Sequence, residues 1–326
     1  MRSMKKPTIK VGKSMYTKWL TWKNFAAVAE ISHAPLNIFW FIFGLAFAQF
    51  NFHQISIRNT IVGLILMLIF DGATNVFNNV MDYQKARDTE GYQKHTSTIG
   101  KLHLPVKGVM RLAIMMYLIT FVLGIVLMDI SHWPVIFFGL IGYFVAIQYS
   151  IGLRLNGTPF GEIATGMSIG FVIPATVVYI NTHINGQILV NFSQPHVLLS
   201  ILLATVPLWS VMLIGSFGNN TADLREDIAN GRKTLVFYLG KPVAVRLIQF
   251  LLIVGPLTTI PLVLEDKAPW LTLITILLLP VIWKLSAPFW REQIKQTTFK
   301  GLFKAISLPL MVYPVTYFIG MLISHK

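Results

Sequence analysis

Apolar runs about as long as a lipid bilayer is thick recur along the whole chain, and they constrain its fold more than any other feature. A helix needs about 20 apolar residues to cross the hydrocarbon core. Several of the runs contain Gly or Pro, which membrane helices tolerate. We therefore expect an all-α integral membrane protein with nine transmembrane helices. The nine runs occupy residues 25–48, 60–81, 110–128, 134–151, 160–180, 196–217, 243–263, 269–288 and 302–323.

The composition also indicates a bilayer environment. Only 12% of the 326 residues are charged and 54% are hydrophobic, whereas roughly 25% charged residues is usual in soluble domains. No long polar segment separates the apolar runs, so we expect one membrane domain, residues 25–326, after a basic N-terminal segment, residues 1–24. The chain has no cysteine, which excludes disulfides, thiolate metal sites and cysteine nucleophiles.

Basic residues are distributed unequally between the two predicted sides of the membrane. With the N-terminus in the cytoplasm, 24 Lys and Arg residues fall on the inner side, and only Arg58, Lys267 and Lys326 fall on the outer side. The positive-inside rule therefore predicts a multi-pass protein of the cell membrane with a cytoplasmic N-terminus. The net charge of +14 is explained by this topology and by attraction to anionic membrane lipid, so no nucleic-acid partner is expected.

Two polar stretches interrupt the apolar pattern, each at the predicted cytoplasmic end of a span. Residues 78–82 and residues 219–223 share the pattern N-N-x-x-D. Helical spacing places their polar side chains along one face of each span, because residues three or four apart are neighbours on a helix. The first stripe consists of Asn75, Asn78, Asn79 and Asp82, and the second of Asn219, Asp223 and Asp227.

Two such stripes facing each other would form a strongly anionic pocket. Hard oxygen ligands without sulfur or imidazole suit Mg²⁺, which binds through one or two carboxylates together with substrate phosphates. Arg225 and Glu226 lie off the stripe and are expected to be solvated. Simple polar helix ends are the alternative, and a single Asp at a span end is usually of that kind; two matched stripes favour a functional site. Basic residues that could contact a phosphorylated ligand are Lys85, Arg87, Lys94, Arg232 and Lys233.

With these two motifs, the sequence resembles the UbiA superfamily of intramembrane prenyltransferases. Within it, the chain looks most similar to the 1,4-dihydroxy-2-naphthoate polyprenyltransferases, whose motifs run N-x-x-N-D-x-x-D-x(5)-D and N-N-x-x-D-x-x-x-D-x-x-x-G-K-x-T-L. Gly161-Glu162 matches a further family pair. The residues in register are Asn75, Asn78, Asp82 and Asp88 in the first motif, and Asn219, Asn220, Asp223, Asp227, Gly231, Thr234 and Leu235 in the second.

The chain departs from the family pattern at several positions. Asn79 stands where the family has Asp, which removes a negative charge from the first motif. Ile228 replaces an Arg, and the usual Gly-Lys reads Gly231-Arg232-Lys233. The basic-Ser-Gly segment after the first motif has Lys94 and Gly100 without the Ser. These changes leave open a divergent acceptor, an altered metal affinity or a reduced activity.

The resemblance implies a nine-helix bundle that transfers a polyprenyl group from its diphosphate to 1,4-dihydroxy-2-naphthoate, with loss of CO₂, in demethylmenaquinone synthesis. It implies Mg²⁺ as cofactor, with polyprenyl diphosphate, an aromatic acceptor and membrane lipid as partners, and it leaves the oligomeric state open. The implied catalytic residues are Asp82, Asp223 and Tyr149. The implied metal-binding residues are Asn79, Asp82, Asp88, Asp223 and Asp227. The implied substrate-binding residues are Asn75, Asn78, Lys94, Arg154, Asn219 and Lys233.

Three alternatives stay open at this point. Another acceptor, such as 4-hydroxybenzoate, haem or a different lipid, is compatible with the same motifs. Tyr149 and Arg154 are also ordinary interface residues for the inner end of a span. A secondary transporter would bind ions at acidic residues near the bilayer midplane. The acidic stripes lie toward one end of their spans and the outer halves are apolar, which favours the enzyme.

Overall fold

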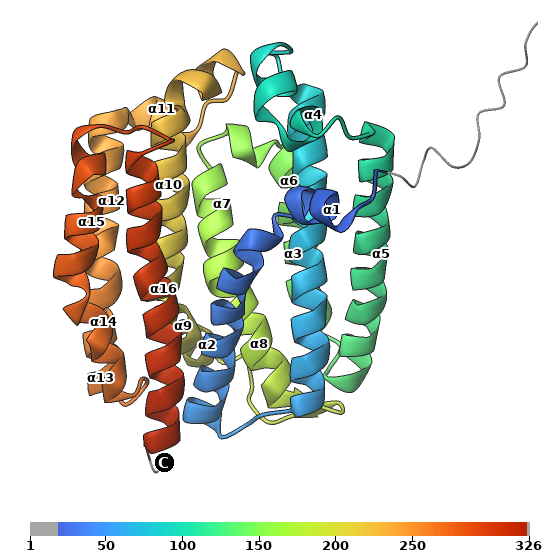
Figure 1. The fold of residues 1–326 in the computed structure, drawn as a ribbon. Helices are drawn as coiled ribbons and strands as arrows, with labels where there is room; N and C mark the ends of the chain where they lie inside the picture. Colours follow the sequence, from blue (N-terminus) through green and yellow to red (C-terminus); the bar gives the residue numbers. More distant parts are fainter. Residues whose placement is uncertain (1–18, 325–326) are drawn as a thin grey trace, which may run out of the picture.

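The computed structural model describes residues 19–324 and consists almost entirely of helices that run side by side (Figure 1). Part of the predicted N-terminal segment, residues 1–18, lies outside the described residues. In the first half of the chain the elements are α1 (Trp22–Val28), η2 (Ile31–His33), α2 (Ala34–Phe52), α3 (Ile57–Lys85), η3 (Gly91–Thr96), α4 (Thr98–Lys101), α5 (Val106–Ile130), α6 (Val135–Ser150), η4 (Leu155–Gly157), α7 (Gly161–Met167), η5 (Ser168–Val172) and α8 (Ile173–Thr182).

A short antiparallel hairpin opens the second half, with His183 paired to Ile188. The remaining elements are β1 (His183–Ile184), β2 (Gln187–Ile188), α9 (Pro195–Ala204), α10 (Val206–Ala229), α11 (Leu235–Leu239), α12 (Lys241–Leu257), α13 (Thr259–Leu264), η6 (Trp270–Leu273), α14 (Ile274–Leu277), α15 (Leu279–Arg291) and α16 (Thr298–Ile323).

Each predicted apolar run overlaps a helical segment, but the segments differ in length. Among the described residues, 7 helices are long and apolar enough to cross a membrane, and 8 if the bent pair α9–α10 counts as one span. The two parts of that pair meet at 55°, where Pro207 supplies no backbone N–H to the helix. Helix α6, over the predicted fourth span, has only 16 residues. The predicted number of nine spans is not confirmed.

The first predicted run, residues 25–48, is divided in the structure. Helix α1 ends at Val28, and Glu30 has a left-handed backbone with φ 52°. Non-glycine residues seldom adopt that conformation, so it breaks the helix. The span proper lies in α2, where Pro35–Phe52 is apolar enough to cross a membrane. As a result α1 lies across α3, near the end of α3 that carries the first motif (Figure 1).

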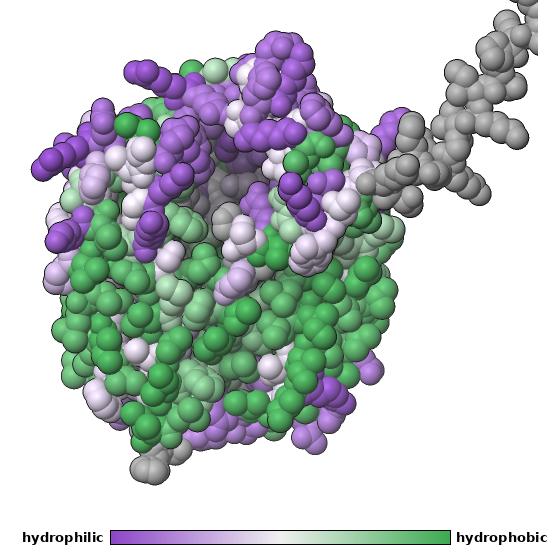
Figure 2. All heavy atoms as spheres, viewed as in Figure 1, coloured by the Kyte–Doolittle hydropathy of each residue, from purple (hydrophilic) through white to green (hydrophobic). Residues whose placement is uncertain are grey.

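On the face shown in Figure 2, an apolar belt crosses the middle of the molecule, and hydrophilic side chains gather at both ends. Large hydrophobic side chains in this belt are exposed, for example Leu118 at 60%, Phe121 at 58% and Leu140 at 56%. Exposure of so much contiguous apolar surface is characteristic of a face that contacts lipid. The chain therefore has the surface of a multi-pass membrane protein.

Two large hydrophobic clusters form most of the interior, beside a small third one around Tyr179. The larger one joins α2, α8, α9, α10, α12, α15 and α16, and it includes the fully buried Trp40 and Phe43. The other large one joins α1, α3, α4 and α5 around Val76 and Val80. Helix α3 carries the first motif and α10 carries the second, so the two motifs come from different clusters. We call the end of the bundle at which α3 and α10 finish the motif end.

Candidate functional site

The last turns of α3 divide the first polar stripe into two rows. Asn75 and Asn79, four residues apart, face the end of α1: Asn75 Nδ2 donates to Ala29 O at 3.3 Å, and Asn79 Nδ2 donates to Val28 O at 3.1 Å. Asn79 Nδ2 also lies 3.3 Å from Glu30 Oε1. An ionised Asp has no proton to donate to these acceptors. The amide at position 79 therefore suits the packing of α1 on α3.

The other row, Asn78 and Asp82, faces the interior of the motif end. Ser150 Oγ at the end of α6 donates to Asn78 Oδ1 at 2.8 Å. Asn156 Nδ2, in η4, donates to Asp82 Oδ1 at 3.4 Å. The stripe expected to share one face thus serves two neighbours, and only this row looks toward the second motif.

On α10, the second stripe is held by a cation from another part of the chain. Lys295 Nζ donates to Asp223 Oδ2 at 2.5 Å and also to Asn219 Oδ1. Asp227, one turn further along, instead pairs with Arg232, whose NH1 lies 3.2 Å from Asp227 Oδ1. Two carboxylates of one motif thus have separate basic partners.

The two motifs meet in a cleft at the motif end. Asp82 of α3 and Asp227 of α10 line the same cleft, although they are far apart in the sequence. The space-filling view shows a hollow at this end, rimmed by hydrophilic side chains (Figure 2). The complete lining consists of Asp82, Lys85, Ala86, Tyr92, Ser150, Arg154, Asn156, Glu226, Asp227, Asn230 and Arg232.

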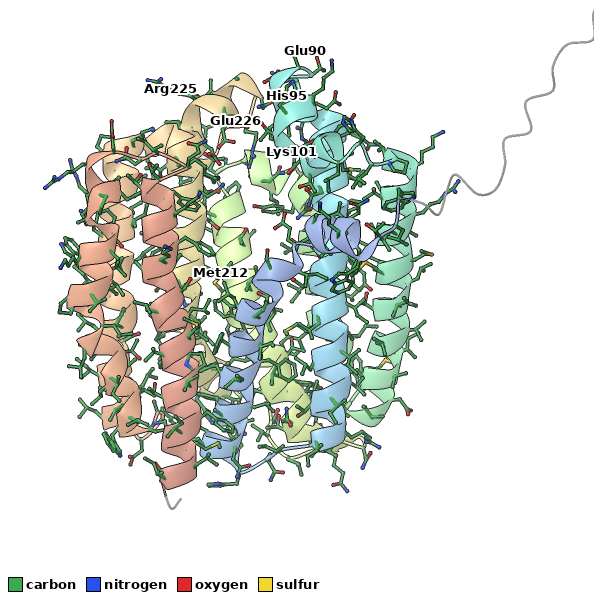
Figure 3. The ribbon with its side chains drawn as sticks, viewed as in Figure 1. Glu90, His95, Lys101, Met212, Arg225 and Glu226 are labelled. Carbon is green, nitrogen blue, oxygen red and sulfur yellow. The ribbon has the colours of Figure 1, made fainter. Side chains whose placement is uncertain are left out.

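Both acidic and basic side chains line this cleft. Glu226 is on the side of α10 that faces the segment carrying Glu90 and His95, whereas Arg225 extends away from the bundle (Figure 3). Lys85 Nζ donates to Ser150 O at 2.6 Å, which fixes its ammonium at the wall. A cleft with both charges can hold a cation and an anion together.

Arg232 ties the second motif to the η4 loop. Its Nε and Nη2 donate to Asn156 O at 3.1 and 2.7 Å, while its third nitrogen faces Asp227. Next to it, Lys233 N donates to Gly157 O at 2.9 Å. A planar guanidinium can make these contacts at once, because its donors form a rigid fork. Arg232 therefore positions both Asp227 and Asn156.

A glycine lets the first motif's loop close onto the second. Gly231 has φ +74°, and a Cβ there would lie 2.5 Å from Cζ of Arg87. Arg87 N also donates to Asn230 Oδ1 at 3.3 Å. A side chain at position 231 would be strained and would displace the Arg87 guanidinium. The close approach of the loop that carries Arg87 to the loop that carries Gly231 therefore explains why position 231 is a glycine.

The donors in the cleft fit a hard divalent cation shared with a phosphorylated ligand. Asp227 Oδ2 is buried and has no hydrogen-bond partner among the described residues. A buried carboxylate oxygen of this kind needs a compensating group. Between residues 19 and 324, no three acidic or His side chains converge to hold an ion alone. Mg²⁺ needs only one or two carboxylates when phosphates complete its shell.

Tyr92 lines the cleft as a protonated phenol. Burial raises the pKa of this phenol well above its usual range, and the negative charge of Asp82 raises this pKa further. A protonated phenol is a hydrogen-bond donor. Tyr92, on η3, therefore presents a donor to an anion in the cleft.

Comparison with protein families identifies the family of the chain. The family model of the UbiA prenyltransferase family matches residues 36–308, which is most of the chain. The chain belongs to the UbiA prenyltransferase family. It is thus a member of a transferase family and a multi-pass membrane protein, as the apolar belt indicates.

Relatives with known functions or structures agree with this family. The chain is 30% identical over 203 residues to the 1,4-dihydroxy-2-naphthoate octaprenyltransferase of Bacillus subtilis (strain 168), and the match covers 61% of each chain. The match thus spans about three fifths of that relative. A UbiA homologue from Aeropyrum pernix K1 superimposes with a TM-score of 0.64 at 14% identity, covering 91% of this chain and 99% of that one. A UbiA homologue from Archaeoglobus fulgidus, bound to GPP and Mg²⁺, gives 0.59 at 12% identity with 91% and 99% coverage.

The UbiA pair Gly161-Glu162 lies beside the second motif. Glu162 is buried, and its Oε1 accepts a hydrogen bond from Asn220 Nδ2 at 2.9 Å. A Cβ at Gly161 would lie 2.4 Å from Leu155 O, so the start of α7 packs closely on η4. This pair therefore connects α7 to α10 and orients the amide of the second UbiA motif.

Other residues predicted from the UbiA pattern lie outside the cleft lining. Asp88 is exposed and caps η3, with its carboxylate accepting from Gly91 N at 2.8 Å. Lys94 pairs with Glu90 at 2.7 Å, and both are exposed. Lys233 is exposed and its Nζ lies 5.8 Å from the centre of the Phe237 ring.

Tyr149 lies at the motif end of α6, and Arg154 lies in the loop after it. Tyr149 is half-buried and precedes Ser150, which lines the cleft, but Tyr149 itself is not part of the lining. Arg154 is exposed, has a left-handed backbone with φ 51°, and lines the cleft. The loop conformation thus directs Arg154 toward the site.

Sequence reasoning assigned no role to several residues that line or adjoin the cleft. Asn156 and Asn230 flank the UbiA motifs in loops, where helical periodicity carries no information. Glu226 is exposed, as expected, and still lines the cleft. Lys295 comes from the connection between α15 and α16, and no local pattern links it to the second motif.

Proposed function

We propose that this UbiA family member transfers a polyprenyl group from its diphosphate to 1,4-dihydroxy-2-naphthoate in a Mg²⁺-dependent reaction. The observation that carries this proposal is the convergence of Asp82 and Asp227 with Lys85, Arg154 and Arg232 on one cleft. Carboxylates for a cation and basic groups for phosphate are what a prenyl diphosphate requires. The bound GPP and Mg²⁺ of the Archaeoglobus homologue support the same chemistry.

In this proposal, carboxylates of both motifs hold the cation. Asp82 and Asp227 line the cleft and would be its protein ligands. Asp223 stands one turn before Asp227 on α10 and, like Asn79 and Asp88, lies outside the lining, so it would reach the cation only by changing partners. A Mg²⁺ ion held by these residues would supply positive charge against the charge that develops on the leaving diphosphate. The unpartnered Oδ2 of Asp227 supports this role, because it is a buried oxygen without a donor among the described residues.

Basic and amide groups hold the diphosphate. Lys85, Arg154 and Arg232 line the cleft, and the Tyr92 phenol adds a donor. Asn78 and Asn219 orient the ends of the two helices, and Asn75 anchors α1. Lys94 and Lys233 lie outside the lining and would contact the diphosphate only after moving. Lys85, Arg154 and Arg232 already line the cleft, so their charges are in place before the anion develops.

The reaction itself proceeds between apolar helices. Breaking the prenyl C1–O bond releases diphosphate and leaves an allylic cation, which water would quench. The electron-rich naphthalene ring attacks this carbon, a carbon–carbon bond forms, and CO₂ leaves to give reduced demethylmenaquinone. Tyr149, half-buried beside the cleft, has an aromatic face suited to a cation. The name of the Bacillus relative gives 1,4-dihydroxy-2-naphthoate as its acceptor, which supports the same acceptor for this chain.

We also propose that the motif end faces the cytoplasm. The basic N-terminal segment, residues 1–24, and the loops near α3, α10 and α16 would then lie on the inner side, as the positive-inside rule predicts. Diphosphate and acceptor arrive there from water, while the prenyl tail and product stay in the membrane domain, residues 25–326.

An acceptor panel tests the proposed function. The purified full chain in lipid nanodiscs is incubated with geranylgeranyl diphosphate, Mg²⁺ and one acceptor: 1,4-dihydroxy-2-naphthoate, 4-hydroxybenzoate or haem. We expect diphosphate release and a prenylated, decarboxylated naphthalene product with the first acceptor, and loss of both with EDTA. Product only with another acceptor would contradict the naphthoate assignment. No product with any acceptor would contradict prenyl transfer to these aromatic substrates.

A further inference from the structure

Lys295 is the basic residue in closest contact with the second motif. Its Nζ donates to Asp223 Oδ2 at 2.5 Å and to Asn219 Oδ1, and it lies 5.0 Å from the centre of the Phe299 ring. Asn219 and Asp223 are four residues apart on α10, so one ammonium bridges two successive turns. Three different groups thus hold the Lys295 ammonium against the motif.

The backbone around Lys295 is fixed by a tight turn. Thr298 Oγ1 donates to Glu292 O at 2.7 Å and accepts from Ile294 N at 2.9 Å. Phe299 N donates to Ile294 O at 3.0 Å, which starts α16 just after Lys295. Only the flexible side chain of Lys295 therefore has to move for its ammonium to change partners.

Close packing of α16 on α10 brings this turn to the motif. A Cβ at Gly218 would lie 2.6 Å from Cδ2 of Leu302 and 3.2 Å from Cε2 of Phe299. The absence of a side chain at position 218 lets the start of α16 approach the residue that precedes Asn219. The contact between Lys295 and the second motif therefore results from the close packing of α16 on α10.

An ammonium and a divalent cation compete for the same oxygens. Lys295 already occupies Asp223 Oδ2, and Asp223 is only 21% exposed. A cation that binds Asp223 through this oxygen has to displace the ammonium. The displaced ammonium, 37% exposed, then needs another anionic partner, and a diphosphate provides one.

We propose that Lys295 is a displaceable counter-ion of the second motif, which competes with the divalent cation for Asp223 and binds the diphosphate once displaced. This inference rests on the proposed function, because it takes Asp223 as part of the cation site. Lys295 then disfavours binding of the cation alone and favours binding of cation and prenyl diphosphate together. The substrate class it recognises is the diphosphate group.

Mn²⁺ binding without substrate tests the competition. Free Mn²⁺ is measured by electron paramagnetic resonance in the presence of the full chain in nanodiscs. We expect K295M to bind Mn²⁺ about three- to tenfold more tightly than the wild type, because a partly exposed ion pair contributes a modest free energy. K295R keeps the charge and should bind Mn²⁺ like the wild type. K300M removes a positive charge from a more exposed side chain in the first turn of α16 and should have no effect.

The second half of the test uses a substitution of Asp223 and an unreactive analogue of the prenyl diphosphate. In a D223N background, K295M should no longer tighten Mn²⁺ binding, because the contested carboxylate is gone. At fixed Mg²⁺, K295M should weaken binding of the unreactive geranylgeranyl S-thiolodiphosphate several-fold. A purely structural role for Lys295 predicts weaker binding of both ligands in K295M, together with a lower unfolding temperature.

Two results would overturn the inference: Mn²⁺ affinity in K295M equal to or weaker than in the wild type, or thiolodiphosphate affinity unchanged or stronger. Both readouts are binding measurements, so they are independent of turnover. If the wild type forms no prenylated product and K295M still binds Mn²⁺ more tightly, the proposed function fails and the competition at Asp223 stands. If product forms and Mn²⁺ affinity is unchanged in K295M, only the role of Lys295 fails.

Discussion

Replacing Asp82 by Asn is expected to lower kcat/KM for prenyl transfer by about 10²–10³-fold, the usual effect of removing one group that stabilises transition-state charge. Asp82 lines the cleft opposite Asp227, and its Oδ1 is oriented by Asn156 at 3.4 Å. The Asn side chain keeps the shape and loses the negative charge. Fewer negative charges mean weaker attraction for the cation on which the leaving diphosphate depends.

Steady-state assays at several Mg²⁺ concentrations measure this effect. We expect D82N to need more Mg²⁺ for its residual activity, with an unfolding temperature close to that of the wild type. D129N is the matched control, since Asp129 is an exposed carboxylate on α5, away from the cleft. A D82N enzyme within about threefold of the wild-type kcat/KM would place the cation elsewhere.

The second large effect is expected for Arg232→Met. The Arg232 side chain holds Asn156 O through two hydrogen bonds and Asp227 through an ion pair at 3.2 Å. Without it, the carboxylate of Asp227, whose side chain is only 5% exposed, loses its basic partner. Leaving a buried polar group unsatisfied costs about 1–3 kcal/mol. We therefore expect a lower thermal unfolding midpoint and at least a tenfold loss of activity.

A double variant separates the two consequences of losing Arg232. D227N/R232M removes the unpaired charge together with its partner, so its unfolding midpoint should rise above that of R232M while its activity stays low. R232K keeps the charge but cannot reproduce the forked contacts, and should retain intermediate activity. Thermal unfolding in detergent and the prenyl transfer assay measure these variants. An R232M midpoint and activity equal to the wild type would contradict the positioning role.

The apolar runs predicted the helices, and helical spacing predicted how the polar residues of the two motifs are arranged on them. Neither predicted which neighbouring segment each polar side chain contacts. Asn75, Asn78, Asn79 and Asp82 occupy adjacent rows of α3, as their spacing requires. Whether a row packs on α1 or looks into the cleft depends on tertiary contacts between distant segments. The division of the first apolar run at Glu30 arises likewise from local backbone geometry within an apolar stretch.

The two motifs point to the proposed site because they end two helices that the fold brings together. The contributions of Asn156 and Lys295 were beyond sequence reasoning, since each residue lies in a connection and reaches the motifs only through helix packing. Lys295 stands 72 residues from Asp223. A single basic residue in a positively charged loop carries no signal that distinguishes it from its neighbours.

The central claim is that both motifs form one cation-dependent diphosphate site, and binding of geranylgeranyl S-thiolodiphosphate with and without Mg²⁺ tests it most directly. Titrations of the wild type, D82N and D227N in nanodiscs are compared with D129N. We predict that Mg²⁺ strengthens binding at least tenfold in the wild type and in D129N, and that either motif substitution removes most of this gain. Equal binding in Mg²⁺ and in EDTA, or full Mg²⁺ enhancement in both D82N and D227N, would contradict the account.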